Sequence, residues 1–383
     1  MASRRNVILG AGVATVALVS VAGWWRVSRV PETATLPWQL KASTPVKDVR
    51  LDALRHAILA PNPHNRQPWL LRLVGDDSVE LYCDLDRRLP ATDPYDRQIL
   101  IGFGTFSELA AIAASTRGQR VEITLFPEGL PNDRLDARPV AYLRFVGDPA
   151  VVADPLATVI AARRSTKEPF DETRAVPRAL LQKLMAPPSP GMVTSFARDA
   201  AQIKPIRETI KKAYEIETRV PRTYQESIEL MRIGAPEIDA NPDGIDLGGP
   251  MLEALALAGQ FDREQLADPK STAFQMGLDQ QLGTYGSLPA AVWLTTNGNS
   301  RADQFAAGRR YVRMNLLATA LGLKMHPTSQ SLQEYPEMAE QYRRIHELLG
   351  ATGNQRVQML ARIGYGPVTD PAPRWPLESH LRI

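Results

Sequence analysis

Apolar and polar positions along the first part of the chain alternate between helical spacing and the two-residue spacing of strands. The elements predicted in order are a helix over 46–60, strands over 69–74 and 79–82, a helix over 99–117, and strands over 121–126 and 141–146. Pro61 and Pro63 end the first helix, because proline cannot continue the helical hydrogen bonding. Gly75 begins the short polar link between the first two strands, which therefore form a predicted hairpin. The helix over 99–117 is apolar on most sides, so we expect it to be buried.

The second part of the chain shows the same two spacings in a different order. The predicted elements are a helix over 177–185, a strand over 192–196, a helix over 203–217, a strand over 290–296, helices over 303–321 and 336–349, and a strand over 357–363. Residues 234–250 are dense in Gly, Pro, Asp and Asn and are predicted to form a long loop. Strands and helices do not alternate regularly, which predicts an α+β fold rather than a doubly wound sheet.

Composition narrows the classes of function. With 44% hydrophobic and 23% charged residues, the composition is typical of a folded globular protein, and 383 residues are enough for two ordinary domains or for one large double domain. The formal net charge is only +3, and no basic run is sustained, so nucleic acid is not an expected partner. Cys83 is the only cysteine, and the five histidines form no metal-binding pair of the H-x-x-x-H type, so no metal site is expected.

The first 30 residues have the pattern of an export leader. Residues 7–25 are uncharged and mostly apolar, and this run has the length of a membrane-spanning helix, roughly 17 to 25 residues. The preceding Arg4-Arg5 pair lies in a string that resembles the twin-arginine signal for export of folded proteins. We expect an exported protein, periplasmic or anchored to the inner membrane by residues 7–25, with the twin-arginine machinery as a partner. Cleavage at the small residues 20–22 and retention as an anchor by Trp24-Trp25 remain alternative fates.

Two polar strings carry the candidate chemistry. The first, over 60–69, reads A-P-N-P-H-N-R-Q-P-W and places several amide side chains between a helix and a strand. Asn and Gln each offer a carbonyl acceptor and two amide donors, which suits a planar heterocycle with carbonyl oxygens and ring nitrogens. The alternative is a loop in which Pro and Asn serve only the turn geometry.

The second string lies at the end of a predicted helix. It contains three cations and two hydroxyl groups in succession: Arg163, Arg164, Ser165, Thr166 and Lys167. Such a group can hold a phosphate through charge-assisted hydrogen bonds. The alternative is a solvated helix end at which the cations meet the helix dipole.

Together, P-x-x-x-N-x-Q-P-W and R-x-S-x-K-x-x-F resemble the two FMN signatures of the nitroreductase superfamily. In that family the R-x-S-x-[RK] segment holds the ribityl phosphate, the other loop lies against the isoalloxazine, and FMN binds at the interface of a homodimer. Each string occurs once here, in the reverse order, and the wider pattern resembles the tandem, Acg-type branch. The resemblance implies a fused pseudo-dimer of two unequal halves, each a mainly antiparallel sheet packed with helices. The expected parts are a leader and linker over 1–45, a first half over 46–150, and a second half over 151–383 with an insertion at about 203–249.

The resemblance also implies one non-covalent FMN at the junction of the halves, held by ten residues. The implied phosphate ligands are Arg163, Ser165, Lys167 and Arg374; the implied ring or ribityl contacts are Pro61, Asn62, Asn65 and Gln67; and Thr328 and Ser329 fall where the family presents backbone groups toward flavin N5. Thr328 and Ser329 could equally be a plain turn after Pro327. No side chain is assigned as a catalytic acid or base. His64 is the one histidine to test, with a packed, hydrogen-bonded role as its alternative.

The function that the resemblance implies is an FMN-dependent, ping-pong oxidoreductase. A small-molecule donor such as NAD(P)H would deliver a hydride to flavin N5 and leave, and a small acceptor would then be reduced in the same cleft. The alternative is an FMN-binding protein with little turnover that serves storage, sequestration or regulation. It is suggested by the loss of one of the two expected sites and by an insertion that could fold over the junction.

Overall fold

The computed structural model describes residues 30–40 and 46–382. The expected leader over 7–25, its Arg4-Arg5 pair and the small residues 20–22 lie outside these described residues. Within them, one helix is long and apolar enough to cross a membrane by length and composition. This helix is α4 (Arg97–Ser115), and 83% of its apolar window is buried inside the protein, as in a core helix.

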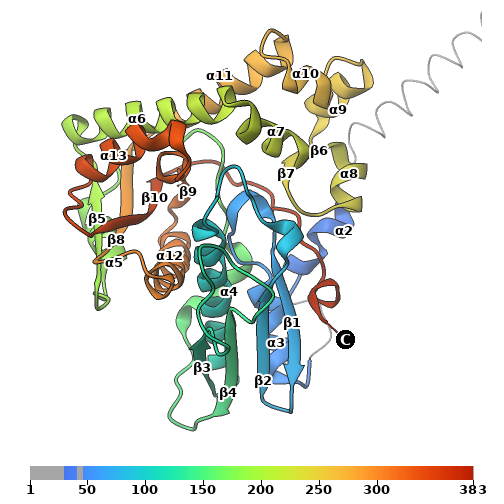
Figure 1. Cartoon of the computed structure of the whole chain (residues 1–383), viewed down its shortest axis with the longest axis vertical. Helices are drawn as coiled ribbons and strands as arrows, with labels where there is room; N and C mark the ends of the chain where they lie inside the picture. The colour runs from blue at the N-terminus through green and yellow to red at the C-terminus, as the bar shows by residue number, and fades with distance from the viewer. Residues whose placement is uncertain (1–29, 41–45, 383) are drawn as a thin grey trace, which may run out of the picture.

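The first half of the fold is a four-stranded antiparallel sheet with its helices (Figure 1). Its elements are α3 (Val49–Ala57), β1 (Trp69–Val74), β2 (Ser78–Cys83), α4, β3 (Gln119–Leu125) and β4 (Ala141–Gly147). The strands lie in the order β1-β2-β4-β3. Gly75 has a φ of 52°, a left-handed conformation that glycine adopts easily, and this turn pairs Trp69 with Cys83 in the hairpin.

The second half repeats this arrangement. Its main elements are α5 (Arg178–Met185), β5 (Met192–Ala197), β8 (Ala290–Thr296), α12 (Arg301–Ala320), β9 (Lys324–Pro327), α13 (Ala339–Leu348) and β10 (Arg356–Gly364). The antiparallel strand order β5-β8-β10-β9 matches the first sheet strand for strand, and in both halves a long helix follows the second strand. The predicted α+β fold with mainly antiparallel sheets is therefore confirmed, and the matching strand orders agree with two fused, unequal halves.

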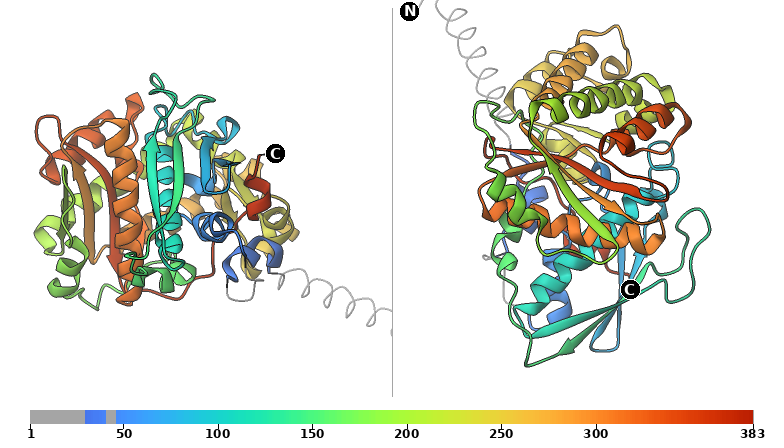
Figure 2. Two further views of the ribbon diagram at one scale, coloured as in Figure 1. Left: turned by 90° about the horizontal axis from the view of Figure 1, so that it is seen from below. Right: turned by 90° about the vertical axis from the view of Figure 1, so that its left-hand side faces the viewer.

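The two long helices α4 and α12 lie side by side and join the halves (Figures 1 and 2). Phe305, Val312 and Leu316 of α12 belong to the core of the first half. Tyr311 and Met314, on another face of the same helix, belong to the core of the second half. One helix thus supplies side chains to both cores, so the halves cannot separate without exposing apolar surface.

The largest difference between the halves is the connection between β5 and β8. It contains α6 (Ala200–Arg219), α7 (Pro221–Glu229), β6 (Met231–Ile233), α8 (Gly234–Ala240), β7 (Ile245–Leu247), α9 (Pro250–Leu257), α10 (Arg263–Ala267) and α11 (Thr272–Gly286). The predicted long loop over 234–250 is wrong, because α8, β7 and the start of α9 occupy it. Gly234 turns with a φ of 78°, and the Glu253 carboxylate accepts a hydrogen bond from the amide of Ala235, which satisfies the start of α8.

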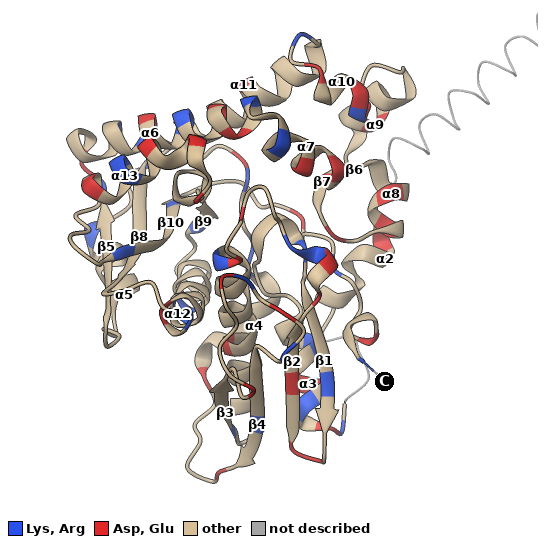
Figure 3. Cartoon of the chain, viewed as in Figure 1, with Lys and Arg blue, Asp and Glu red and all other residues tan. Residues whose placement is uncertain are grey.

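Both ends of the described chain lie beside the first half. The short helix α2 (Glu32–Thr35) packs on α8, and Asp and Glu residues occur along both helices (Figure 3). The C-terminal segment after β10 leaves the second half and crosses to the first, where Leu381 forms a bridge with Leu71 of β1. The indole Nε1 of Trp38 donates to the carbonyl of Ala372 at 2.8 Å, so the two ends of the chain are bound to each other.

Candidate functional site

Arg163 connects the two candidate strings across the junction of the halves. Its side chain is 2% exposed, and its guanidinium donates to the carbonyl of Leu59 and to Oδ1 of Asn315, each at 3.1 Å. Leu59 directly precedes the amide-rich loop of the first half, and Asn315 lies on α12. The R-x-S-x-K segment of the second half is thus in direct contact with the first half.

Arg374 reaches the same place from the C-terminal segment. This guanidinium is also 2% exposed and donates to the carbonyls of Ile58 at 2.9 Å and Ala60 at 3.1 Å. It also donates to the side-chain carbonyl of Asn65. The structure therefore brings Arg163, Arg374 and Asn65 together, although they are far apart in sequence.

Trp38 is the centre of a cluster of three arginines. The guanidinium carbons of Arg163, Arg164 and Arg374 lie 5.7, 4.7 and 5.3 Å from the centroid of its ring. None of the three forms an ion pair with a carboxylate of the described chain. We call Trp38 and these three residues the arginine cluster.

The arginine cluster carries positive charge that no ion pair among the described residues neutralises, although the charges of Asp370 and Asp246 act on Arg164 and Arg374. Burial lowers the pKa of Arg163 to about 10, and burial with the nearby charge of Arg163 lowers the pKa of Arg374 to about 9. Both groups remain charged at neutral pH, so their burial costs free energy that an anion would offset. The sequence indicated Arg164 only as one of the cations of the second string, and nothing in the local sequence marks Trp38 as a partner of arginines.

Three donors in the second string have no partner within the described chain. The Nε atoms of Arg163 and Arg164 and the hydroxyl of Thr166 are buried and make no hydrogen bond. Buried polar groups are normally paired with a hydrogen-bond partner. The three unpaired donors belong to residues 163, 164 and 166, next to cations that form no ion pair, so they need an acceptor. A phosphate group offers several strong acceptor oxygens, and this donor set therefore fits the phosphate of FMN.

Ser165 and Lys167 complete the string but point to different partners. The hydroxyl of Ser165 accepts a hydrogen bond of 3.5 Å from Arg163. The ammonium of Lys167 forms an ion pair of 2.9 Å with Asp246 of β7 and is half exposed. Lys167 therefore contacts the connection between β5 and β8 rather than the arginine cluster.

The amide-rich loop has an unusual backbone that is fixed against α4. His64, Asn65 and Gln67 have φ values of 46°, 53° and 50°, the left-handed region that residues other than glycine seldom adopt. Asn62 holds the loop in this form, because its side-chain carbonyl accepts the amide of Gln67 at 2.7 Å. The carbonyl of Pro61 accepts the hydroxyl of Thr105 on α4 at 2.7 Å. Such conformations cost about 1 to 3 kcal/mol each and are typical of functional sites.

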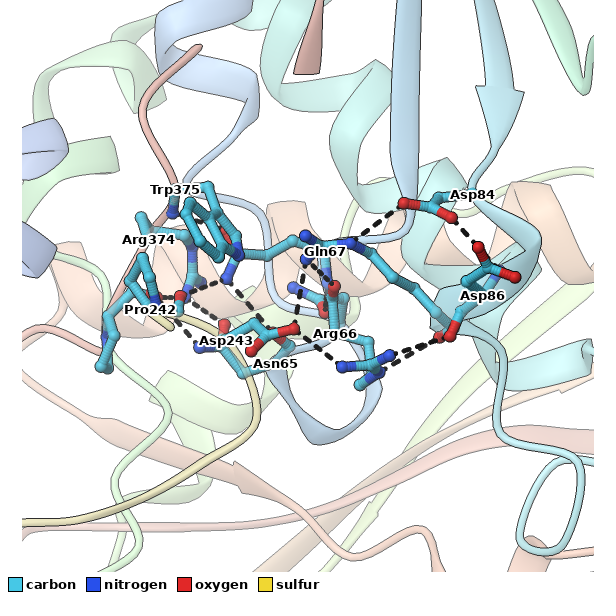
Figure 4. Close-up of polar contacts among 12 residues, drawn as sticks. Asn65, Arg66, Gln67, Asp84, Asp86, Pro242, Asp243, Arg374 and Trp375 are labelled. Atoms are coloured by element: carbon cyan, nitrogen blue, oxygen red, sulfur yellow. Dashed lines mark hydrogen bonds and ion pairs between the residues drawn. The ribbon is translucent and has the colours of Figure 1, made fainter. Parts of the chain in front are cut away.

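Two amide side chains of this loop are bound to other segments of the chain (Figure 4). Gln67 donates from Nε2 to the carbonyl of Pro242 at 2.7 Å and accepts the amide of Trp375 at 3.0 Å. Asn65 donates from Nδ2 to the carbonyl of Pro373 at 2.9 Å. In this structure both side chains therefore hold the C-terminal segment, and Gln67 also holds the turn before β7.

Asp243 fixes that turn to the loop through arginines. Its carboxylate accepts from Arg66 at 2.7 Å, from Arg232 at 2.9 Å and from Arg87 at 3.2 Å, and its side chain is 7% exposed (Figure 4). We call residues 241–247 the covering segment, because Asp243 and Pro242 bind it to the amide-rich loop and Asp246 binds it to Lys167. Sequence reasoning missed Arg66 and Asp243, although Arg66 lies within the first string.

The histidines near this point are neutral. Burial, then the charges of Lys167 and Arg66, lowers the pKa of His64 to about 4. Burial, then the charges of Arg362 and Lys167, holds the pKa of His326 well below its usual value. Lys167 therefore lies near an imidazole from each half, which again places the candidate residues at the junction.

The predicted turn after Pro327 lies at the end of β9. The amide of Thr328 donates to the carbonyl of Leu360 at 2.8 Å, and its side chain is fully buried, so this amide belongs to the sheet. Ser329 is partly exposed and precedes a short 3-10 helix, Gln330–Leu332. Of this pair, Ser329 is the residue with a surface open to a ligand.

Comparison with known proteins gives relatives along most of the chain, although no family model matches it. The chain is 26% identical over 327 residues to "Putative NAD(P)H nitroreductase Rv3131" of Mycobacterium tuberculosis (strain ATCC 25618 / H37Rv), covering 84% of this chain and 86% of that protein. The chain is also 38% identical over 89 residues to "Putative NAD(P)H nitroreductase acg" of the same strain. This match covers 23% of this chain and 26% of that protein.

Among solved structures, the FMN-dependent nitroreductase NfnB from Mycobacterium smegmatis, in complex with NADPH, has 18% identity and a TM-score of 0.34. That match covers 60% of this chain and 97% of NfnB. A nitroreductase-like family protein from Bacillus cereus has 17% identity and a TM-score of 0.33, covering 61% of this chain and 97% of that protein. The chain is thus similar over most of its length to a protein whose name is "Putative NAD(P)H nitroreductase".

Proposed function

We propose that this protein is an FMN-dependent oxidoreductase that takes electrons from a small-molecule donor such as NAD(P)H and passes them to a small acceptor. One observation carries the proposal: the arginine cluster has three cations without a carboxylate partner and lies beside unpaired donors of the R-x-S-x-K segment. The relatives with the name "Putative NAD(P)H nitroreductase" support the same class.

In this proposal the residues of the arginine cluster hold the phosphate of FMN. Arg163, Arg164 and Arg374 supply charge, and the hydroxyls of Ser165 and Thr166 supply further donors. Arg163 and Arg374 are already fixed by the carbonyls of Ile58, Leu59 and Ala60, so little side-chain entropy is lost when an anion binds. FMN, when bound, supplies the hydride chemistry, and the protein binds, orients and tunes it.

The amide-rich loop and the turn at Ser329 would contact the ring and ribityl chain. Asn62 keeps the loop in its left-handed form, whereas Asn65 and Gln67 would exchange their present partners for the ligand. The imidazoles of His64 and His326 are neutral and place no positive charge next to the flavin ring. The ammonium of Lys167 would provide a positive charge there. No residue of this chain needs to act as an acid or base in the reaction.

The covering segment favours a second candidate function, an FMN-binding protein of low turnover for storage, sequestration or regulation. The ion pairs of Asp243 with three arginines and of Asp246 with Lys167 hold residues 241–247 against the loop. A segment fixed in this way would hinder a large donor more than a small reductant. Rapid oxidation of NAD(P)H with a nitroaromatic or quinone acceptor would eliminate this candidate.

An absorbance spectrum of the purified protein, taken before and after incubation with FMN, tests the proposal first. A yellow protein that is bleached by NADH or NADPH without oxygen, and regains colour with an acceptor, supports the oxidoreductase. A yellow protein that dithionite reduces and neither nicotinamide does supports the low-turnover candidate. A colourless protein that takes up no FMN contradicts both.

We also propose that the leader exports the protein already folded, either to the periplasm or to the outer surface of the inner membrane. The sequence of the Arg4-Arg5 string and the apolar run over 7–25 support this. Export after folding would allow a non-covalent cofactor to be acquired in the cytoplasm.

A further inference from the structure

Helix α9 exposes apolar side chains and buries its only charged one. Met251 is 62% exposed and Leu257 is 51% exposed, whereas Glu253 is 2% exposed. Surface helices of soluble proteins normally have the opposite arrangement, with apolar residues inside and charges outside. The orientation of α9 is therefore a feature that needs an explanation.

The buried Glu253 fixes this orientation. Its carboxylate accepts the amide of Ala235 at the start of α8, and its Oε1 lies 2.7 Å from the position that a Cβ on Gly234 would take. Leu252 and Leu255 pack partly against the small core formed by Ile228, Phe261 and Leu266. Rotating α9 to bury Met251 and Leu257 would remove the Glu253 hydrogen bond and expose Leu252 and Leu255, so the apolar face stays outside.

This apolar face lies close to the place where the leader joins the described chain. Helix α8 contacts both α9 and α2, and the amide of Ala34 in α2 donates to Oδ1 of Asp239 in α8 at 3.0 Å (Figure 1). Val30 at the start of the described chain is 61% exposed, and Leu36 just after α2 is 54% exposed. Four of the most exposed large apolar side chains therefore occur on α9 and on the segment that is joined to it through α8. We call the exposed side of α9, with Met251 and Leu257, the α9 face.

The sequence between the leader and Val30 limits how far the α9 face can be from a membrane. The apolar run ends at Trp25, five residues before Val30. Five residues span at most about 17 Å when fully extended. Helix α8, which contacts both α2 and α9, adds about 10 to 12 Å, the diameter of a helix with its side chains. A protein anchored by residues 7–25 would therefore keep α9 within about 30 Å of the bilayer, close enough for its exposed side to reach the lipid.

We propose that the α9 face lies on a lipid bilayer, with Met251 and Leu257 inserted among the acyl chains while residues 7–25 anchor the protein. The exposed side of α9 carries no charge, and Glu32 of α2 and Glu237 and Asp239 of α8 are acidic, so the contact does not require anionic lipid and takes place on neutral lipid as well (Figure 3). A leader that spans the bilayer cannot also cover α9, which leaves this face for the lipid. The inference does not depend on FMN or on any oxidoreductase activity.

Site-directed fluorescence on the full chain in phosphatidylcholine vesicles tests the proposal. Cys83 is 2% exposed and burial raises the pKa of its thiol, so a cysteine placed on the surface is labelled selectively. Single variants Met251→Cys and Leu257→Cys would carry an environment-sensitive dye. Val193→Cys on β5 is the matched control, because Val193 is 51% exposed, as Leu257 is, and lies at the opposite side of the molecule from α9 (Figure 1).

We expect brominated acyl chains to quench the dyes at positions 251 and 257 at least about threefold more than the dye at 193. Equal quenching at all three positions would overturn the proposal. Replacing part of the lipid by phosphatidylglycerol should not increase the quenching; a strict requirement for anionic lipid would contradict the apolar contact.

Discussion

Gly104 of α4 and Gly308 of α12 touch at the crossing of the two long helices. A Cβ on either glycine would lie 3.0 Å from the Cα of the other and would collide with a backbone carbonyl of the opposite helix, that of Phe305 or Ile101. The halves are therefore joined where neither helix has a side chain. This close approach is what allows α12 to contribute to both cores.

We expect Gly308→Ala to destabilise the protein by at least about 1 to 3 kcal/mol, the usual cost of overpacking, because the backbone of α4 must move to admit the methyl group. Thermal or denaturant unfolding would measure the change. The matched control is Gly277→Ala in α11, where nothing lies within 4 Å of the added Cβ. That variant should gain about 0.5 to 1 kcal/mol from the higher helix propensity of alanine. Equal stability of the two variants would show that the helices can separate at the crossing.

Arg164→Ala should weaken FMN binding without breaking the contact between the halves. The guanidinium of Arg164 bonds only to the nearby carbonyls of Ala161 and Arg163, so its loss leaves the bonds from Arg163 to Leu59 and Asn315 intact. A charge-assisted hydrogen bond contributes about 1.5 to 3 kcal/mol, which corresponds to roughly a ten- to hundredfold weaker Kd. Arg163→Ala should cause a loss at least as large. Fluorescence titration of FMN would give the Kd.

The control for these variants is Arg343→Ala. Arg343 is exposed and pairs with Glu347 on the same helix, so its removal should leave the Kd for FMN unchanged. Retention of full FMN affinity by Arg164→Ala and Arg163→Ala together would refute the phosphate site at the arginine cluster.

The strands and helices of both halves could be predicted because their signals are local. The hairpin of β1 and β2 follows from alternation and one glycine, and the strand over 290–296 has the predicted bounds. The loop predicted over 234–250 failed because the start of α8 is satisfied by Glu253, a partner from another helix that local composition does not reveal. Where tertiary contacts stabilise an element, composition alone is a weak guide.

The candidate site shows the same limit. Recognisable strings identified Arg163, Asn65 and Gln67 as candidates, and the structure places them at one junction. Trp38 was missed because its contacts are with Ala372 and with arginines that are distant in sequence. Asp243 was missed because its ion pair with Arg66 forms only when the connection between β5 and β8 folds back onto the amide-rich loop. The spacing of apolar and polar residues does not indicate that path.

Asp243→Asn should loosen the covering segment and speed the reduction of bound FMN by NAD(P)H. The carboxylate neutralises three arginines, and its loss leaves them without that partner at a cost of about 3 to 5 kcal/mol for a buried pair. Anaerobic stopped-flow absorbance would compare the reduction rates by NADPH and by dithionite. We expect the NADPH rate to rise by more than the dithionite rate.

Asp148→Asn is the control for that experiment, since Asp148 pairs with the half-exposed Arg120 in the first half. It should change neither rate. If Asp243→Asn leaves the ratio of the two rates as in the unaltered protein, then the covering segment does not restrict the donor, and the low-turnover candidate loses its structural support.

Replacing Arg4 and Arg5 together by lysine should leave the folded protein in the cytoplasm, because the export machinery for folded proteins reads the arginine pair rather than its charge. Fractionation of cells followed by immunoblotting would measure the distribution. Arg26→Lys, which alters a basic residue on the other side of the apolar run, should not change it. An unchanged distribution of the double variant would exclude the twin-arginine route.

Glu217 should make the stability of the protein fall as the pH rises from about 4.5 to 7. Burial raises the pKa of this carboxyl to about 7, and its Oε2 accepts a hydrogen bond of 2.9 Å from Gln333. Because the folded state binds the proton more tightly than the unfolded state, this contribution is complete below pH 4.5 and is lost as the pH passes through 7. A shift of that size corresponds to about 3 kcal/mol.

In Glu217→Gln the side-chain carbonyl can still accept from Gln333, so the variant should be as stable as the unaltered protein at pH 4.5 and more stable at pH 8. The midpoint temperatures at the two pH values measure this, with Glu340→Gln on the exposed surface of α13 as the control. Parallel pH profiles for Glu217→Gln and the unaltered protein would mean that Glu217 is already ionised in the folded state, with water or another donor stabilising the charge.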